Sequence, residues 1–294
     1  MSVAFLRRKG SGKETCEAIA SKMNNIVKVV RVDKPMPNTV QTVIRWGAAV
    51  PLGGNKEVFN SGAAIQRVSN KTDFRKLLKD KVPHLIPKTW TKGDFAHIVD
   101  FPVIARPSHH QSGKDFYYCE THQEMISATK KCGDNFYISQ YIPKAEEYRV
   151  CFMQGRVAWV ARKYPDHEGQ IAWNNAEGGH FENVKWKQWK SPVLQTAYEA
   201  FSLSGLDFGG VDVITGLDGK HYVLEINSCM GVTSEYRQTC MAKVFDYMVD
   251  NGSDTIPLNE EKISWGRYIH PALLEVAEEN NLVAVEKNPL EDWI

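Results

Sequence analysis

The sequence predicts an α/β (α+β) protein, and three observations support that class. Residues 209–214 and 221–227 are rich in β-branched and apolar side chains and are predicted to form an antiparallel pair of strands. Residues 191–204 and 235–249 instead repeat apolar side chains at helical spacing. Residues 1–60 alternate short strands with a helix. With 294 residues, of which 43% are hydrophobic, the chain can bury a core of strands and helices.

Composition narrows the classes of function. The net charge of +1 gives no general attraction to nucleic acid, although the basic residues at 7–9 and Lys13 leave a local contact with an anionic polymer open. The six cysteines form no C-x-x-C pair, so reduced thiols and a cytoplasmic location are expected. No apolar run has the length of a signal peptide or a membrane span, so we expect no membrane partner. Composition gives no indication of the oligomeric state.

Residues 1–60 are predicted to form a short N-terminal α/β unit. The expected elements are strands at 3–6, 26–32 and 40–46 and a helix at 14–23. The segment Gly10-Ser11-Gly12-Lys13 partly matches a phosphate-binding loop, but that motif needs glycine where Arg7 stands and serine or threonine where Glu14 stands. A basic loop that leads into the helix is the better interpretation.

Residues 61–142 are predicted to form a second unit. Its expected elements are a helix start at 60–66, a helix at 70–78 and strands at 101–107, 116–119 and 136–142. Lys71, near a helix start, is either a solvated lysine or placed for an anion. Arg106 ends a buried strand, where its fork of donors suits phosphate. In the polar loop that follows, His109 and His110 are interpreted as loop residues rather than metal ligands.

Residues 143–250 are predicted to form a third and larger unit, followed by a tail, 251–294, with one helix near 271–279. Strands are expected on both sides of a turn at Gln154-Gly155, at 146–153 and 156–162, before a polar loop at 173–180. Glu147 and Arg149 lie on the same face of the first of these strands, and a surface ion pair is the ordinary interpretation.

The central strand pair, 209–227, contains the most informative pattern. Asp218-Gly219 favours a two-residue turn, because a type I′ turn needs positive φ at both central residues. With that turn, Asp212 faces Glu225, and Asn227 faces Gly210. Asp212, Glu225 and Asn227 then share one face of the pair. The opposite face is expected to hold Val211, Val213, Leu224 and Ile226.

Two facing carboxylates repel each other, so this face needs a positive group. Its expected neighbours, Ile214 and Val223, are apolar, which argues against free solvation. Carboxylate and amide oxygens are ligands that suit Mg²⁺. The pattern alone leaves two interpretations open, a magnesium site and a solvated polar face on an edge hairpin.

Taken together, these segments resemble the ATP-grasp superfamily, and most closely its carboxylate–amine ligases, such as ribosomal-protein glutamate ligases, glutathione synthetase and D-alanine–D-alanine ligase. The resemblance runs from about residue 60 to 231 and rests on the order and spacing of the segments. It covers Asn70-Lys71, the strand at 101–107, Gln111-Ser112-Gly113-Lys114, Ser139-Gln140-Tyr141-Ile142 and the central strand pair. It implies two α+β subdomains, 61–142 and 143–250, that clasp ATP behind the short N-terminal unit.

The resemblance also implies a role for each site residue. The nucleotide-binding positions fall on Lys71, Arg106, Ser112, Gly113, Gln140, Tyr141, Ile142 and Glu147. The positions that hold the reacting carboxylate or act in catalysis fall on Arg149, Arg162 and Asn175. The magnesium ligands fall on Asp212, Glu225 and Asn227, in agreement with the pattern of the central strands.

The implied activity is ATP-dependent amide formation between a carboxylate and an amine through an acyl phosphate, with release of ADP and phosphate. ATP and two magnesium ions are implied, with Mn²⁺ able to substitute, and each substrate could be a small molecule, a peptide or a modified polymer. Two departures from the family stand out: Arg106 replaces a lysine, and Ser228-Cys229-Met230 replaces a segment with proline. Phosphoryl transfer without ligation and a catalytically degenerate ATP-binding module remain alternatives.

Overall fold

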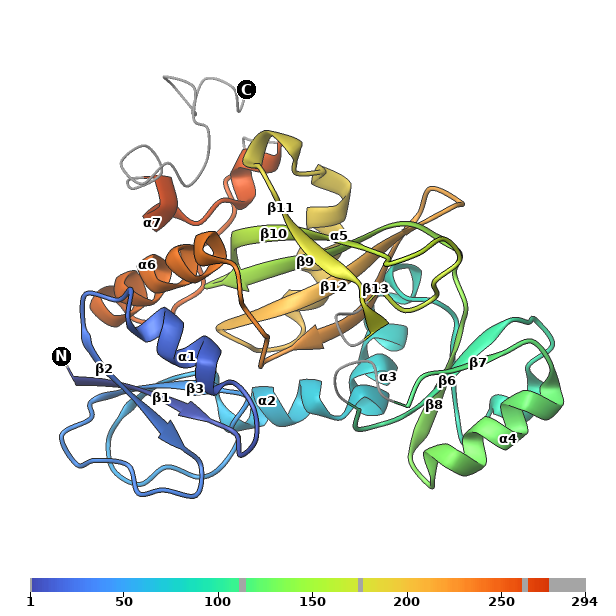
Figure 1. The fold of residues 1–294 in the computed structure, drawn as a ribbon, viewed down its shortest axis with the longest axis horizontal. Helices are drawn as coiled ribbons and strands as arrows, with labels where there is room; N and C mark the ends of the chain where they lie inside the picture. The colour runs from blue at the N-terminus through green and yellow to red at the C-terminus, as the bar shows by residue number, and fades with distance from the viewer. Residues whose placement is uncertain (1, 111–114, 174–176, 261–263, 275–294) are drawn as a thin grey trace.

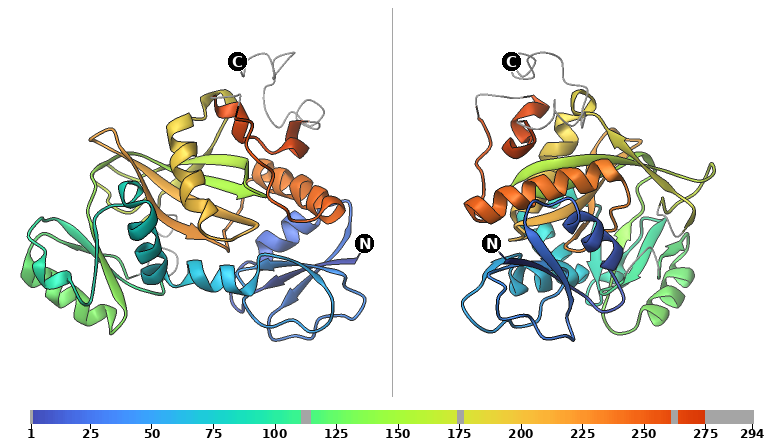
Figure 2. Two further views of the ribbon diagram at one scale, coloured as in Figure 1. Left: turned by 180° about the vertical axis from the view of Figure 1, so that it is seen from behind. Right: turned by 60° about the vertical axis from the view of Figure 1, so that its left-hand side comes forward.

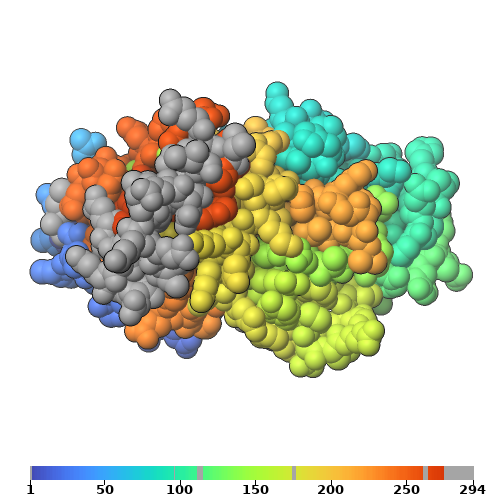
Figure 3. Space-filling view, turned by 90° about the horizontal axis from the view of Figure 1, so that it is seen from above, coloured from blue at the N-terminus to red at the C-terminus, as the bar shows by residue number. Residues whose placement is uncertain are grey.

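The computed structural model describes residues 2–110, 115–173, 177–260 and 264–274, and these residues form three β-sheets (Figure 1). Two four-stranded sheets lie at opposite ends of the molecule, and a five-stranded sheet lies between them (Figure 2). Seen from above, residues of the central sheet and of helix α5 form the middle of the surface (Figure 3). The mixed α+β class predicted from the sequence is confirmed.

The N-terminal sheet is parallel, with strand order β2-β1-β3-β4. Its elements are β1 (Ser2–Arg7), α1 (Lys13–Ala20), β2 (Ile26–Arg31), β3 (Thr42–Trp46) and β4 (Glu57–Phe59). The three strands predicted from the sequence are therefore present. The short strand β4 was not predicted, because three residues are too few to show a period.

The second sheet is antiparallel, with strand order β5-β8-β6-β7. This part of the chain contains α2 (Gly62–Ser69), α3 (Lys71–Lys81), β5 (Thr89–Thr91), β6 (Val103–Pro107), β7 (Tyr117–Cys119), α4 (His122–Cys132) and β8 (Phe136–Gln140). The sequence analysis missed α4, although Thr121 and Glu124 form a complete capping box at its start.

The central sheet is antiparallel, with strand order β11-β10-β9-β12-β13. Its strands are β9 (Lys144–Met153), β10 (Arg156–Tyr164), β11 (His180–Val184), β12 (Phe208–Gly216) and β13 (His221–Asn227). One face packs on α5 (Ser191–Ser202), where the rings of Phe152 and Phe201 stack 4.9 Å apart. The other packs on α6 (Glu235–Asn251), where Phe208 meets Phe245 at 5.0 Å. Helix α6 therefore packs on the face of the sheet that carries Asp212, and α5 packs on the opposite face.

The chain is completed by short helices. They are the 3-10 helices at Pro83–Leu85, Phe95–His97, Trp186–Gln188 and Trp265–Tyr268, and α7 (Pro271–Leu274). The predicted helix near 271–279 begins where expected, and its later residues lie outside the described residues. No helix in the described ranges has the length and apolar character needed to cross a membrane.

The pairing of β12 with β13 confirms the predicted register at the site and corrects the turn. Asp212 pairs with Glu225, and Gly210 pairs with Asn227. The predicted type I′ turn is wrong: Gly219 N–H donates to the carbonyl of Gly216, and only Gly219 of the loop residues has positive φ, +77°. The loop therefore has three residues, which shifts the pairing next to the turn by one.

A β-bulge at Leu224 restores the register before the site is reached. Val213 pairs with Val223, whereas Asp212 pairs with Glu225, so Leu224 is the extra residue. Val223 consequently lies in the core, and Leu224 lines the cavity on the other face. The sequence analysis had placed these two side chains on the opposite faces, because it assumed an unbroken alternation.

Candidate active site

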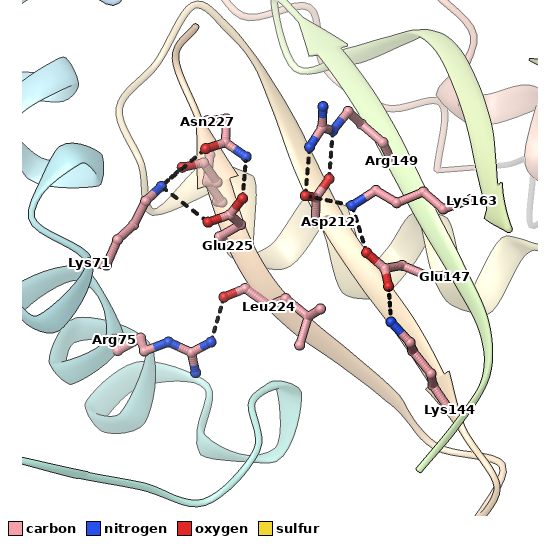
Figure 4. A network of polar contacts seen from close by, with 11 residues as sticks. Lys71, Arg75, Lys144, Glu147, Arg149, Lys163, Asp212, Leu224, Glu225 and Asn227 are labelled. Carbon is pink, nitrogen blue, oxygen red and sulfur yellow. Dashed lines mark hydrogen bonds and ion pairs between the residues drawn. The ribbon is translucent and has the colours of Figure 1, made fainter. Parts of the chain in front are cut away.

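A cavity of about 850 Å³ lies where the three sheets meet. Its lining combines β12, β13, β9 and β10 with α3, β6 and β8, and its far end reaches the start of α1. This volume is within the ordinary range for ligand pockets, ~300–1,000 Å³. Polar and charged side chains from the central sheet point into it (Figure 4).

Asp212 is the centre of one group of charges in this cavity. Arg149 donates to both of its carboxylate oxygens, from Nε at 2.6 Å and from Nη2 at 2.7 Å (Figure 4). Lys163 Nζ lies 2.9 Å from Oδ2. Burial opposes ionisation of this carboxyl, but Arg149 and Lys163 outweigh it and hold the pKa of Asp212 below its ordinary value. Asp212 is therefore an anion.

Glu147 continues the same network. Lys163 Nζ lies 2.6 Å from its Oε1, and Lys144 donates to its other oxygen. Its side chain is 5% exposed. Burial alone would raise the pKa of Glu147. Lys163 and Lys144 have the larger, opposite effect, so the pKa lies below its ordinary value. Lys163 thus bridges the two carboxylates, Glu147 and Asp212.

Glu225 belongs to a second group, on the next strand. Lys71 Nζ donates to the Ile226 carbonyl at 2.6 Å, and it lies 3.3 Å from Asn227 Oδ1 and 3.9 Å from Glu225 Oε2. Asn227 Nδ2 donates to Glu225 Oε1 at 2.9 Å. Burial opposes ionisation, yet Lys71 and neighbouring cations bring the pKa of Glu225 well below its ordinary value. Burial lowers the pKa of Lys71.

The donor set of Asp212, Glu225 and Asn227 fits a hard divalent cation. Two carboxylates and an amide on paired strands supply oxygen ligands only. The ammonium of Lys71 already lies among the oxygens of Glu225, Ile226 and Asn227, which shows that this position favours a cation. In the described part of the chain, no cluster of three or more His, Cys, Asp or Glu side chains offers an alternative metal site.

The predicted nucleotide-binding residues that the structure describes line the same cavity. Lys71, Arg106, Gln140, Tyr141, Ile142 and Glu147 all contribute to its surface. The structure therefore brings these positions together around one volume. Ser112, Gly113 and Asn175 lie outside the described residues.

Arg162 is the predicted site residue that the structure does not bring to the cavity. Its guanidinium pairs with Glu146 at 3.4 Å and stacks on Tyr164, on the face of β10 away from Asp212. A regular hairpin from the Gln154-Gly155 turn would pair Arg162 with Glu147. A bulge between Val157 and Trp159 shifts the register by one residue, so that Lys163 pairs with Glu147 instead.

Four basic residues that line the cavity were missed by the sequence analysis: Arg75, Lys144, Lys163 and Arg237. Arg75 Nη2 donates to the Leu224 carbonyl at 2.6 Å, which satisfies the carbonyl at the bulge. The alternation of Glu147 and Arg149 along β9 gave the correct face for those two residues. The same alternation could not identify Lys163, because a bulge leaves no reliable mark in a single sequence.

The loop after β13 closes the cavity at the end near the N-terminal sheet. Met230 is 2% exposed and packs over Gly210, where a Cβ atom would lie 2.2 Å from the methionine sulfur. Cys229 packs against Gly47, whose φ is +70°. The unusual segment noted in the sequence therefore forms a tight contact between the central sheet and β3 through small residues.

Comparisons with known proteins show the family of the chain. A model of the RimK-like ATP-grasp domain family matches residues 82–246, more than half of the chain. A probable alpha-L-glutamate ligase of Aeromonas salmonicida (strain A449) is 27% identical over 190 residues, which cover 60% of this chain and 62% of that protein. This chain thus matches about three fifths of the length of that relative.

Solved structures show the same fold. D-alanine–D-alanine ligase from Bacillus anthracis superposes with a TM-score of 0.61 at 14% identity, over 95% of this chain and 100% of that chain. The ATP-grasp ligase PsnB, complexed with a minimal precursor, Mg and ADP, gives 0.60 at 13% identity, over 85% and 97%. The chain belongs to the RimK-like ATP-grasp domain family, within the superfamily that its sequence resembles.

Proposed function

We propose that this protein uses ATP to activate the carboxylate of an amino acid or a peptide and joins it to an amine. The observation that carries the proposal is the single cavity onto which Asp212, Glu225 and Asn227 open beside Lys71 and Arg149. The printed names of the similar proteins, a glutamate ligase, a D-alanine ligase and a ligase bound to a peptide precursor, support an amino acid or peptide substrate.

In this proposal the subdomains 61–142 and 143–250 hold ATP between them. Lys71 and Arg106 contact its phosphates, the backbone of 140–142 contacts adenine, and Glu147 contacts the ribose. Ser112 and Gly113 cover the phosphates. Asp212, Glu225 and Asn227 hold two Mg²⁺ ions, for which Mn²⁺ substitutes; when bound, such ions neutralise charge on the phosphate oxygens.

The chemistry proceeds in two balanced steps. A carboxylate oxygen of the substrate forms a bond to the γ-phosphorus of ATP, the bond from that phosphorus to the bridging oxygen breaks, and ADP leaves. The amine nitrogen then attacks the acyl carbon, and inorganic phosphate leaves with the electron pair of the C–O bond. The amine loses a proton to phosphate or water. Arg149 and Lys163 stabilise the developing oxyanion in a buried setting, together with Asn175.

Lys163 takes the role in this scheme that the resemblance had assigned to Arg162. Its ammonium lies between Asp212 and Glu147 in the cavity, whereas the Arg162 guanidinium lies on the other face of β10. A phosphorylated substrate in the cavity would contact the face of β10 that carries Lys163.

The first test is thermal melting of the purified protein with Mg²⁺ and ATP, ADP, AMP or GTP. A ligand at ~100-fold its dissociation constant adds about 2.7 kcal/mol to stability. We expect a magnesium-dependent rise in the melting temperature with ATP that is weaker in Asp212→Asn. Melting that does not respond to any nucleotide would favour a degenerate module.

The second test separates ligation from phosphoryl transfer to an alcohol. ATP, Mg²⁺ and hydroxylamine are incubated with L-glutamate or D-alanine. An acyl phosphate gives a hydroxamate, which a coloured iron complex reports, whereas a phosphorylated alcohol does not. In a parallel assay with L-serine, whose side chain is an alcohol, release of ADP with a phosphorylated alcohol product and no hydroxamate would establish the kinase alternative.

A further inference from the structure

Arg237 is a buried cation at the far end of the cavity. It lies in the first turn of α6 and is 6% exposed. Its guanidinium stacks over the rings of Trp159, at 5.5 Å, and Phe181, at 5.8 Å. The same residue lines the cavity, and its enclosed Nε atom has no hydrogen-bond partner in the described structure.

The other cations around Asp212 are neutralised. Arg149 and Lys163 contact Asp212, and Lys71 contacts Glu225. No carboxylate within the described residues forms an ion pair with Arg237, and Arg149 is a like charge near it. Burial, reinforced by Arg149, lowers the pKa of Arg237. A buried charge without a partner is costly, so this position favours an anion that the folded chain does not itself supply.

The start of α6 adds to the positive potential at this place. The helix has 17 residues, and its N-cap residue, Ser234, makes no side-chain cap; its hydroxyl instead contacts Asn183. A helix N-terminus carries a partial positive charge, so a cation in the first turn is unfavourable unless an anion lies near it. The acidic residue of that turn, Glu235, has an 85% exposed side chain that pairs with Lys22 at 2.9 Å and forms no ion pair with Arg237. Gly231 and Thr233, just before the helix, line the same end of the cavity.

We propose that Arg237 and the first turn of α6 bind a carboxylate of the substrate. The proposal rests on the ligase function proposed above and deepens it, since it requires that a substrate carry a carboxylate at the end of the cavity next to α6. Arg149 differs from Arg237 in that its Nε and Nη2 already donate to Asp212. Amino acids and peptides satisfy the requirement, and a polyamine does not.

The subsite can hold the carboxylate of either substrate. It binds the carboxylate that is phosphorylated, or it binds a second carboxylate that belongs to the amine substrate. Arg237 would contact both carboxylates in the same way. The two cases differ in whether the Michaelis constant of the acid or that of the amine substrate depends on Arg237.

The first measurement needs no substrate. Arg237→Met keeps the unbranched stem and removes the charge, so the ligand-free variant should melt at the same temperature as the parent or higher. Lys243→Met removes a charge from α6 away from the cavity and serves as the control. A fall of more than about 3 °C in Arg237→Met alone would show that Arg237 is a structural residue, and would overturn the proposal.

The second measurement uses L-glutamate and D-alanine as probes. Hydroxamate formation with ATP and hydroxylamine gives the Michaelis constant of the acid without the amine. If the acid is held, Arg237→Met raises that constant by roughly 10- to 100-fold, Arg237→Lys recovers part of the loss, and the constant for ATP stays unchanged. If the amine substrate is held, only the coupled reaction with D-alanine as the amine shows the increase.

The outcomes also separate this inference from the proposed function. If ATP raises the melting temperature and Arg237→Met binds and uses both probes like the parent, the carboxylate subsite is wrong and the ligase function stands. If ATP with Mg²⁺ has no effect on the parent, the ligase function fails. If the parent responds to ATP but to neither amino acid, the amino-acid assignment of the subsite is overturned.

Discussion

Lys163 connects two buried carboxylates of the site. Its ammonium contacts Glu147 and Asp212, and all three side chains are at most 5% exposed. Replacing Lys163 with methionine leaves two buried carboxylates with one partner fewer, which should cost about 3 kcal/mol of folding free energy. The same change should abolish most of the ATP-dependent activity. Urea unfolding and ADP release measure the two effects.

Arg162→Met is the matched control for that variant. Arg162 is adjacent in sequence, but its side chain is one-third exposed and pairs with Glu146 on the other face of β10. Its loss should cost less than about 1 kcal/mol and leave activity close to that of the parent. Loss of activity in Arg162→Met with little loss in Lys163→Met would show that the resemblance-based role of Arg162 is correct and the role of Lys163 is not.

Glu225 makes the stability of the site depend on pH. Its folded-state pKa is well below the ordinary 4.5, so the unfolded chain takes up a proton first as the pH falls. The contribution of this carboxylate is therefore complete above about pH 4.5 and is lost as the pH falls toward the folded-state pKa. Glu225→Gln should be less stable than the parent at pH 7, and the difference should shrink below pH 4.5.

Unfolding in urea at pH 7, 5 and 3.5 measures this difference. Glu168→Gln, at an exposed position, serves as the control and should stay within about 0.5 kcal/mol of the parent at each pH. A constant difference between Glu225→Gln and the parent at all three values would contradict the ion pair with Lys71.

At the scale of elements, β12 is shaped by its contact with the loop after β13. A Cβ atom at Gly210 would lie 2.2 Å from Met230 Sδ and 3.2 Å from its Cγ. Gly210→Ala should destabilise the fold by about 1–3 kcal/mol, because the buried methionine has to move. In a Met230→Ala background the same change should cost much less.

A double-mutant cycle in urea isolates this coupling between Gly210 and Met230. An additive result, with the same penalty in both backgrounds, would mean that Gly210 is required for its backbone conformation and not for the close approach of Met230.

At the scale of the whole molecule, Asn60 joins the N-terminal unit to the central sheet. Its side chain accepts hydrogen bonds from Asp207 N–H at 2.8 Å and Phe208 N–H at 3.1 Å, and it donates to the Phe208 carbonyl at 2.9 Å. Its backbone has φ of +66°, in the left-handed region. Asn60→Gly should lose the hydrogen bonds alone, and Asn60→Ala should lose them and add about 1 kcal/mol of strain.

The parent should therefore be the most stable, Asn60→Gly less stable and Asn60→Ala the least stable. Thermal melting and proteolysis between residues 47 and 61 measure this order. If Asn60→Ala is as stable as Asn60→Gly, the positive φ contributes no strain. If both equal the parent, the contact does not hold the two parts together.

The amino-acid sequence alone was enough to propose the oxygen ligands on the central strand pair. Asp212, Glu225 and Asn227 alternate on two strands, and strand alternation is a local property that a single chain reveals. The family could be recognised for the same reason, because spacing along the chain survives when few residues are identical. The register at Asp212 was predicted correctly, although the predicted turn was wrong and the bulge at Leu224 compensated for it.

The neighbours of these ligands became visible in the folded molecule. Two bulges, at Leu224 and beside Val157, set which side chains of β13 and β10 face the cavity. Bulges depend on contacts with adjacent strands, such as the Arg75 contact with the Leu224 carbonyl. Arg237 is far from the central strands in sequence, and its lack of a partner in the described structure appears only when α6 packs against the sheet. Burial and pairing are properties of the folded molecule, so no sequence pattern could show them.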